Sequence, residues 1–130
     1  MHMKILTKAE EQVMQYLWKI KKGFLKDVVE QFPEPKPAYT TISTVIRVLV
    51  KKGFIGHKTY NKANEYYPII NKDEYSKVNF KRLMIGYFNN SPEKFASFFT
   101  NENNLTLSEL EEIKKIVEDQ IKRQGAKRNE

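Results

Sequence analysis

Small hydroxyl side chains and basic side chains recur at helical spacing between residues 38 and 52. They are Thr40, Thr44, Arg47 and Lys51, at positions i, i+4, i+7 and i+11. A helix over this stretch would carry all of them on one face, and that face has no acidic residue. Short hydroxyl groups allow close approach to hydrogen-bonding edges, and a cation can pair with a base or a phosphate. This face therefore predicts contact with a nucleic acid duplex.

The other face of the same helix is apolar. Its members are spaced i, i+3, i+4 and i+7, as on a face that packs against a core; they are Ile42, Val45, Ile46 and Leu49. Gly53 is expected to follow the end of the helix, because glycine readily adopts the left-handed conformation found there. The pattern predicts a helix over 38–52 with one core face and one polar face.

Other elements are expected on both sides of this helix. A capping box at Thr7 and Glu10 predicts a helix that ends near Gly23 and has Trp18 on its core face. A short helix is expected over 24–32, and the proline-rich stretch 33–37 is expected to be a stiff loop. Residues 54–60 and 65–69 predict two strands joined by a turn at 61–64. Three helices followed by a hairpin form the layout of a winged helix-turn-helix domain, expected over residues 1–72.

The rest of the chain predicts a second, helical module over 73–130. One helix is expected over 73–89, a second begins at Ser91 and Pro92, and a third begins with a capping box at Thr106 and Glu109. The polar tail 123–130 is expected to fray. The expected fold class is mainly α with a small β-hairpin wing, followed by a helical dimerisation module.

Charge is distributed unequally between the two modules. The net charge is +7, and the whole excess lies in residues 1–72, because residues 73–130 hold 10 basic and 10 acidic side chains. A basic module beside a neutral one favours a polyanionic partner for the first, although a basic surface without any partner would give the same numbers. The residues expected to contact DNA are Lys36, Tyr39, Thr40, Thr41, Ser43, Thr44, Arg47, Lys51, His57, Lys58 and Lys62.

Three stretches resemble the penicillinase and methicillin-resistance repressor family (BlaI/MecI/CopY). They are 41–46 with 51–55, Glu11 to Trp18 in the first helix, and His57-Lys58 with the later Tyr66-Tyr67-Pro68. The resemblance implies a homodimeric repressor of a two-fold symmetric operator, and it allows a membrane-bound sensor protease as a further partner. It also implies that the C-terminal helices form the dimer, through Leu83, Tyr87, Phe95, Phe98, Leu110, Ile113 and Val117.

The chain departs from the family pattern in three places. The family often has arginine followed by leucine at the end of the recognition helix, whereas here Val48 precedes Leu49 and the arginine is Arg47. That moves the guanidinium by about 100° around the helix. The Asn-Phe bond cleaved in the β-lactam-responsive branch is absent from 97–100, which reads Ser-Phe-Phe-Thr, and the copper-responsive branch uses cysteines that this chain lacks.

The sequence contains no constellation expected of an enzyme. Its histidines are His2 and His57, it has no cysteine and 5 glycines, and no phosphate-binding glycine loop or metal-ligand set is present. No cofactor is expected. No apolar run is long enough to span a membrane, and the first six residues lack the apolar stretch of a signal peptide, so a cytoplasmic protein is expected. Three hypotheses remain: a sequence-specific repressor, a non-specific architectural DNA-binding protein, and a winged-helix module for protein contacts.

Overall fold

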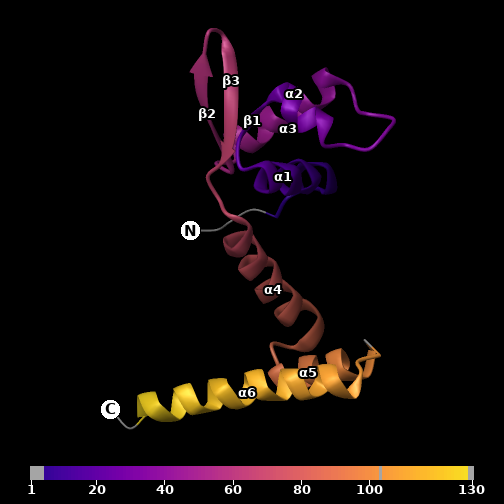
Figure 1. The fold of residues 1–130 in the computed structure, drawn as a ribbon, viewed down its shortest axis with the longest axis vertical. Coiled ribbons are helices and arrows are strands. Elements are labelled where there is room, and N and C mark those ends of the chain that lie inside the picture. The colour runs from indigo at the N-terminus through magenta and orange to yellow at the C-terminus, as the bar shows by residue number, and fades with distance from the viewer. Residues whose placement is uncertain (1–4, 103, 129–130) are drawn as a thin grey trace. The chain divides into compact units, whose positions relative to one another are not determined.

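The computed structural model describes residues 5–102 and 104–128, so His2 lies outside the described residues. The chain forms two compact units, Met1–Arg82 and Leu83–Glu130. The first holds α1 (Lys8–Ile20), β1 (Gly23–Phe24), α2 (Leu25–Glu30), α3 (Tyr39–Lys51), β2 (Ile55–Tyr60) and β3 (Ala63–Pro68) (Figure 1). Helix α4 (Lys72–Phe88) runs from the first unit into the second, which also holds α5 (Pro92–Glu102) and α6 (Leu107–Arg128). The expected fold class, mainly helical with a hairpin wing, is confirmed.

The core of the first unit lies between α1, α2 and α3. The predicted apolar faces meet there, and their buried members include Val13, Met14, Leu17, Val28, Val29, Ile42, Ile46 and Leu49. Trp18 lies half-buried at the edge of this core, where its indole N–H donates to the Ile70 carbonyl at 2.9 Å. The core leaves the opposite side of α3 in solvent, which is what the two-faced pattern predicted.

The helix boundaries follow the predicted capping residues at most ends. Thr7 and Glu10 form the capping box of α1, and Gly53 has a φ of 83° immediately after α3. The first helix ends at Ile20 rather than near Gly23. Gly23 does not end α1 as predicted but is buried in β1. A Cβ at this position would lie only 2.9 Å from Ile20 Cδ1, so there is no room for a side chain. The helix predicted over 24–32 was wrong at both ends: Phe24 pairs in a strand, and α2 ends at Glu30.

The wing is the two-stranded part of a small antiparallel sheet with the order β1-β3-β2. Strand β1 pairs Gly23 with Tyr66, and this pairing was not predicted. The turn is tighter than the predicted 61–64, because Tyr60 already pairs with Ala63. Asn61 and Lys62 have φ angles of 46° and 70°, as in the two-residue turns that match the twist of a hairpin.

Gly56 and Tyr67 face one another across the wing. They are register partners in β2 and β3. A Cβ on Gly56 would lie 2.6 Å from Tyr67 Cζ, so the tyrosine ring occupies the space that a side chain at position 56 would need. The absence of a side chain at Gly56 therefore allows the Tyr67 ring to lie across the backbone of the neighbouring strand.

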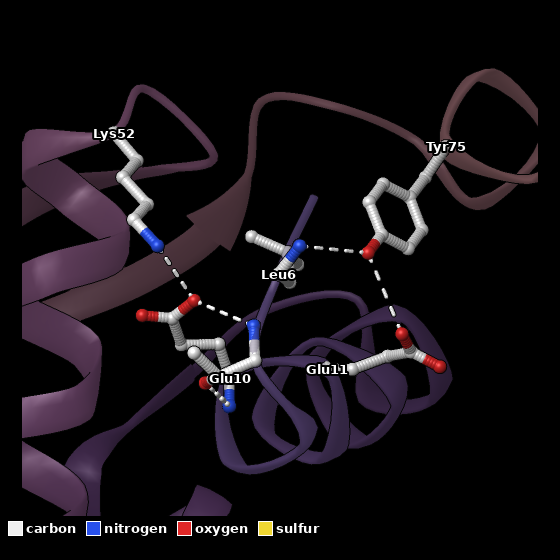
Figure 2. Close-up of polar contacts among 6 residues, drawn as sticks. Leu6, Glu10, Glu11, Lys52 and Tyr75 are labelled. Carbon is white, nitrogen blue, oxygen red and sulfur yellow. Dashed lines mark hydrogen bonds and ion pairs between the residues drawn. The ribbon is translucent and has the colours of Figure 1, made fainter. Parts of the chain in front are cut away.

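A group of polar contacts joins α1 to the end of α3 and to the first turn of α4 (Figure 2). Glu10 is buried, and its carboxylate accepts from Lys52 Nζ at 2.7 Å and from the Thr7 N–H at 2.9 Å. Burial alone would raise the pKa of Glu10, but the hydrogen bonds from Lys52 and Thr7, together with the lysine charge, lower it below its ordinary value. The pair therefore holds two helices of the first unit together as ions.

Tyr75 makes the other contacts in this group. Its ring is buried against Trp18 and Phe54, at centroid distances of 5.9 and 5.8 Å. Its hydroxyl accepts from the Leu6 N–H at 3.0 Å and lies 3.4 Å from a carboxylate oxygen of Glu11 (Figure 2). The first turn of α4 is thereby part of the first unit.

The second unit packs its helices loosely. Ser91 caps α5 at the Lys94 N–H, Thr106 and Glu109 form the predicted capping box of α6, and Phe88 lies against Phe95 at 5.5 Å. Helix α6 continues to Arg128, past the point where fraying was expected. Met84 is the one buried side chain among this unit's described residues. The contacts divide the chain after Arg82, so the boundary predicted at 72/73 falls at the first turn of α4 and stays a prediction.

Candidate nucleic-acid interface

The outer face of α3 consists of Thr40, Thr44, Arg47 and Lys51. All of them are exposed, as is Thr41 beside them, while Ser43 is half-buried. Tyr39, the first residue of the helix, is 49% exposed. Among the described residues, neither Arg47 nor Lys51 has an ion-pair or hydrogen-bond partner for its side chain. The structure therefore brings the predicted residues of α3 together with two cations available to a partner.

Two neighbouring lysines at the end of α3 have different environments. Lys51 projects into solvent, whereas the Lys52 side chain is 21% exposed and is paired with Glu10. The separation follows from the helix itself, because consecutive residues lie about 100° apart around its axis. Of the two, Lys51 belongs to the outer face of α3.

The wing contributes the remaining predicted contacts. His57, Lys58 and Lys62 are exposed on β2 and on the turn. Lys58 Nζ lies 5.6 Å from the centroid of the Tyr60 ring, and His57 lies edge-on to Tyr66 at 6.2 Å. A hollow of about 320 Å³ separates the wing from α3; it is lined by Ser43, Ile46, Arg47, Val50, His57, Asn64 and Tyr66. The wing and the outer face of α3 therefore border the same surface of the unit.

Lys36 has a structural role that the sequence did not indicate. Its ammonium donates to the carbonyl oxygens of Glu30 and Phe32, at 2.9 and 2.8 Å, and so satisfies the C-terminal end of α2. An ammonium held in this way has less freedom to follow a phosphate than Lys51 or Lys62. Its contact with DNA stays a prediction.

Val48 is the residue of this surface that sequence reasoning missed. It is 38% exposed on α3, one turn after Thr44. The signal was present in the core pattern, because Ile42, Ile46 and Leu49 already define the buried side and Val48 falls outside it. Valine was overlooked because apolar side chains on a helix are usually assigned to the core.

The described residues contain no group of three or more acidic or histidine side chains placed to hold a metal ion. No helix in the described ranges 5–102 and 104–128 is both long and apolar enough to cross a bilayer. The surface combines hydroxyl, amide and cationic groups around one exposed helix with the exposed apolar side chain of Val48.

Three packed helices, a β-hairpin wing and a basic polar face on the third helix define a winged-helix DNA-binding protein. The family model described as "Penicillinase repressor" matches residues 6–119. The chain belongs to the penicillinase repressor family, a family of transcriptional repressors.

Individual relatives agree with this assignment. The methicillin resistance regulatory protein MecI of Staphylococcus aureus (strain N315) is 26% identical over 113 residues, which cover 86% of this chain and 92% of that protein. The penicillinase repressor of Bacillus licheniformis is 24% identical over 115 residues, covering 88% of this chain and 90% of that one. The solution structure of the DNA-binding domain of the repressor BlaI aligns with a TM-score of 0.50 and 25% identity, over 57% of this chain and 92% of that domain.

Proposed function

We propose that this repressor binds a two-fold symmetric DNA operator as a homodimer, with α3 in the major groove and the wing against neighbouring phosphates. The observation that carries the proposal is the outer face of α3, which is exposed, hydroxyl-rich and basic, and has no acidic residue. The major groove admits one α-helix, and short side chains let its backbone approach the base edges. The likeness to a solved structure described as the DNA-binding domain of the repressor BlaI supports a DNA-binding role for this part of the chain.

The second unit supports the homodimer. It exposes large apolar side chains that a single chain leaves in water: Leu83, Ile85, Tyr87, Phe98, Leu107, Ile116, Val117 and Ile121. Of the residues predicted for the dimer interface, Leu83, Tyr87, Phe98 and Val117 are in this set, while Phe95, Leu110 and Ile113 are half-buried. Exposed apolar surface on this scale marks an interaction site. A second copy of the chain would cover it. A two-fold symmetric operator offers such a dimer two major-groove sites about 34 Å apart, one turn of DNA, one for each α3.

Selection from a pool of random duplexes tests the proposal, at about 150 mM salt so that weak phosphate contacts do not dominate. We expect one inverted repeat to be enriched. Failure to enrich any sequence, together with binding that disappears as salt rises, would overturn sequence-specific repression and leave a non-specific architectural protein.

A winged helix used for protein contact is the second alternative. Such a module would be expected to have an acidic or apolar face on its third helix, whereas the outer face of α3 is basic and polar apart from the neighbouring Val48, so DNA is favoured. The selection itself separates this alternative as well, because a protein-contact module would bind no duplex and none would be enriched.

The proposed DNA partner implies that the protein acts in the cytoplasm of a bacterium. A membrane-bound sensor protease is proposed as a further partner on the family resemblance alone. Cleavage would have to occur outside residues 97–100, which read Ser-Phe-Phe-Thr inside α5; the chain has an Asn-Phe bond elsewhere, at Asn79-Phe80 in α4. Mass mapping of the chain after induction would identify any such bond, and an intact chain during induction would remove this partner.

A further inference from the structure

We propose that Thr44 and Val48 form a methyl-bearing pair on α3 that recognises the 5-methyl group of thymine in each half of the operator. The inference rests on the proposed function, because it assumes that α3 lies in the major groove. It goes further in naming a base and the two side chains that select it.

The first observation is the exposure of Val48. Valine is not favoured at an exposed helix position, because its branched side chain loses rotamer freedom there. Here 38% of the residue is exposed, on the side of α3 that faces away from the core. It is adjacent in sequence to Arg47 and lies between the cations of the outer face and Thr41 around the helix. Contact with an apolar group of the partner would account for its exposure.

The second observation concerns the hydroxyl of Thr44. Its Oγ1 donates to the Thr40 carbonyl at 3.0 Å, one turn back in the helix. With the hydroxyl hydrogen used in this way, the γ-methyl becomes the part of Thr44 best suited to contact a base. Thr44 and Val48 are separated by four residues, so their side chains lie one above the other on α3. Together they form a small apolar strip beside two cations.

The major groove contains one exposed apolar group on its base edges, the C5 methyl of thymine, and threonine methyls and other apolar side chains contact it. A basic helix face with an apolar strip therefore matches a duplex with thymine opposite the strip. The neighbouring Arg47 fits either a guanine edge or a phosphate. Thr44 and Val48 would thus select thymine at one position of each half-site by burying its methyl group rather than by hydrogen bonding.

The test replaces single thymines of the selected inverted repeat by 2′-deoxyuridine, which removes only the methyl group. Burying one methyl is worth about fourfold in affinity, so we expect about a fourfold loss at one symmetric thymine position for the unmodified protein. In Val48→Ala the unmodified duplex should bind more weakly, and the thymine-to-deoxyuridine ratio should fall below about twofold. Thr44→Ser keeps the hydroxyl and removes only the γ-methyl, so it should lower the ratio in the same direction.

Ile69→Ala is the matched control, since it removes an exposed apolar side chain of the first unit that lies off α3. It should leave the ratio at about fourfold. A ratio that stays at fourfold in Val48→Ala, or an operator in which no thymine is sensitive, would overturn the methyl pair while the repressor function stands. If no duplex is enriched at all, the proposed function itself fails and the methyl pair fails with it.

Discussion

Lys51 and Lys52 are consecutive in sequence, yet we expect Lys52→Met to lower stability without affecting DNA binding and Lys51→Met to weaken DNA binding without affecting stability. Lys52→Met removes the cation 2.7 Å from Glu10 and leaves a buried carboxylate behind. Loss of one partner of a fully buried pair costs about 3–5 kcal/mol. Glu10 keeps the hydrogen bond from the Thr7 N–H, and Lys52 is not fully buried. We therefore expect the free energy of unfolding to fall by about 2 kcal/mol at neutral pH.

The effect of Lys52→Met should depend on pH with a defined sign. In the unmodified protein the pKa of Glu10 is lowered, so the charged carboxylate stabilises the fold above its ordinary pKa, and this contribution is lost as the pH falls through the lowered value. In Lys52→Met, only the contacts with Thr7 oppose the effect of burial on Glu10, so the pKa of Glu10 should rise. The difference in stability between the two proteins should be largest near neutral pH and should shrink below about pH 4.

Urea denaturation followed by the fluorescence of Trp18 measures this difference in the first unit, because the chain has 1 tryptophan. Lys51→Met is the control: it should leave the midpoint unchanged and should reduce the salt dependence of DNA binding by about one phosphate contact. Lys52→Met should leave that salt slope unchanged. Equal destabilisation by both variants, or a loss in Lys52→Met that grows in acid, would refute the structural role assigned to the Glu10 pair.

Three further predictions concern other parts of the chain. Arg47→Ala should weaken operator binding by about 1–3 kcal/mol if the guanidinium contacts a base. An equal loss of affinity for random duplex, measured by filter binding or anisotropy, would show that Arg47 contacts only a phosphate. Tyr75→Phe leaves the buried Leu6 N–H without its acceptor, and should lower the free energy of unfolding by about 1–2 kcal/mol in the same urea titration; an unchanged midpoint would contradict this. Val117→Glu places a charge on the exposed apolar stripe of α6 and should yield monomers by sedimentation, whereas a persisting dimer would place the interface elsewhere.

The parts of the fold with strong periodicity were predictable from the sequence. Ile42, Ile46 and Leu49 recur at core spacing and are buried, and the capping boxes at Thr7 and Thr106 begin their helices as expected. These features are local, because a helix face and a cap depend on residues within a few positions of one another. The outer face of α3 was predictable for the same reason.

Features that depend on distant partners were not predictable. Strand β1 is too short to show alternation, and it exists because Gly23 meets Tyr66. Helical spacing placed Lys51 on the outer face of α3, but it could not show that the partner of Lys52 is Glu10, which lies 42 positions earlier in the chain. The bonds from Lys36 to the end of α2 likewise depend on how the proline-rich loop returns to that helix.

The close approach of Tyr67 to Gly56 has a consequence for the evolution of the wing. A side chain at position 56 requires the Tyr67 ring to move or a smaller residue to replace it, because a Cβ there would meet the ring at 2.6 Å. Among aligned relatives we expect the two positions to covary, with glycine opposite an aromatic residue and larger side chains opposite small ones. Such a linked pair would let the outline of the wing change between family members while the helices beneath it keep their packing.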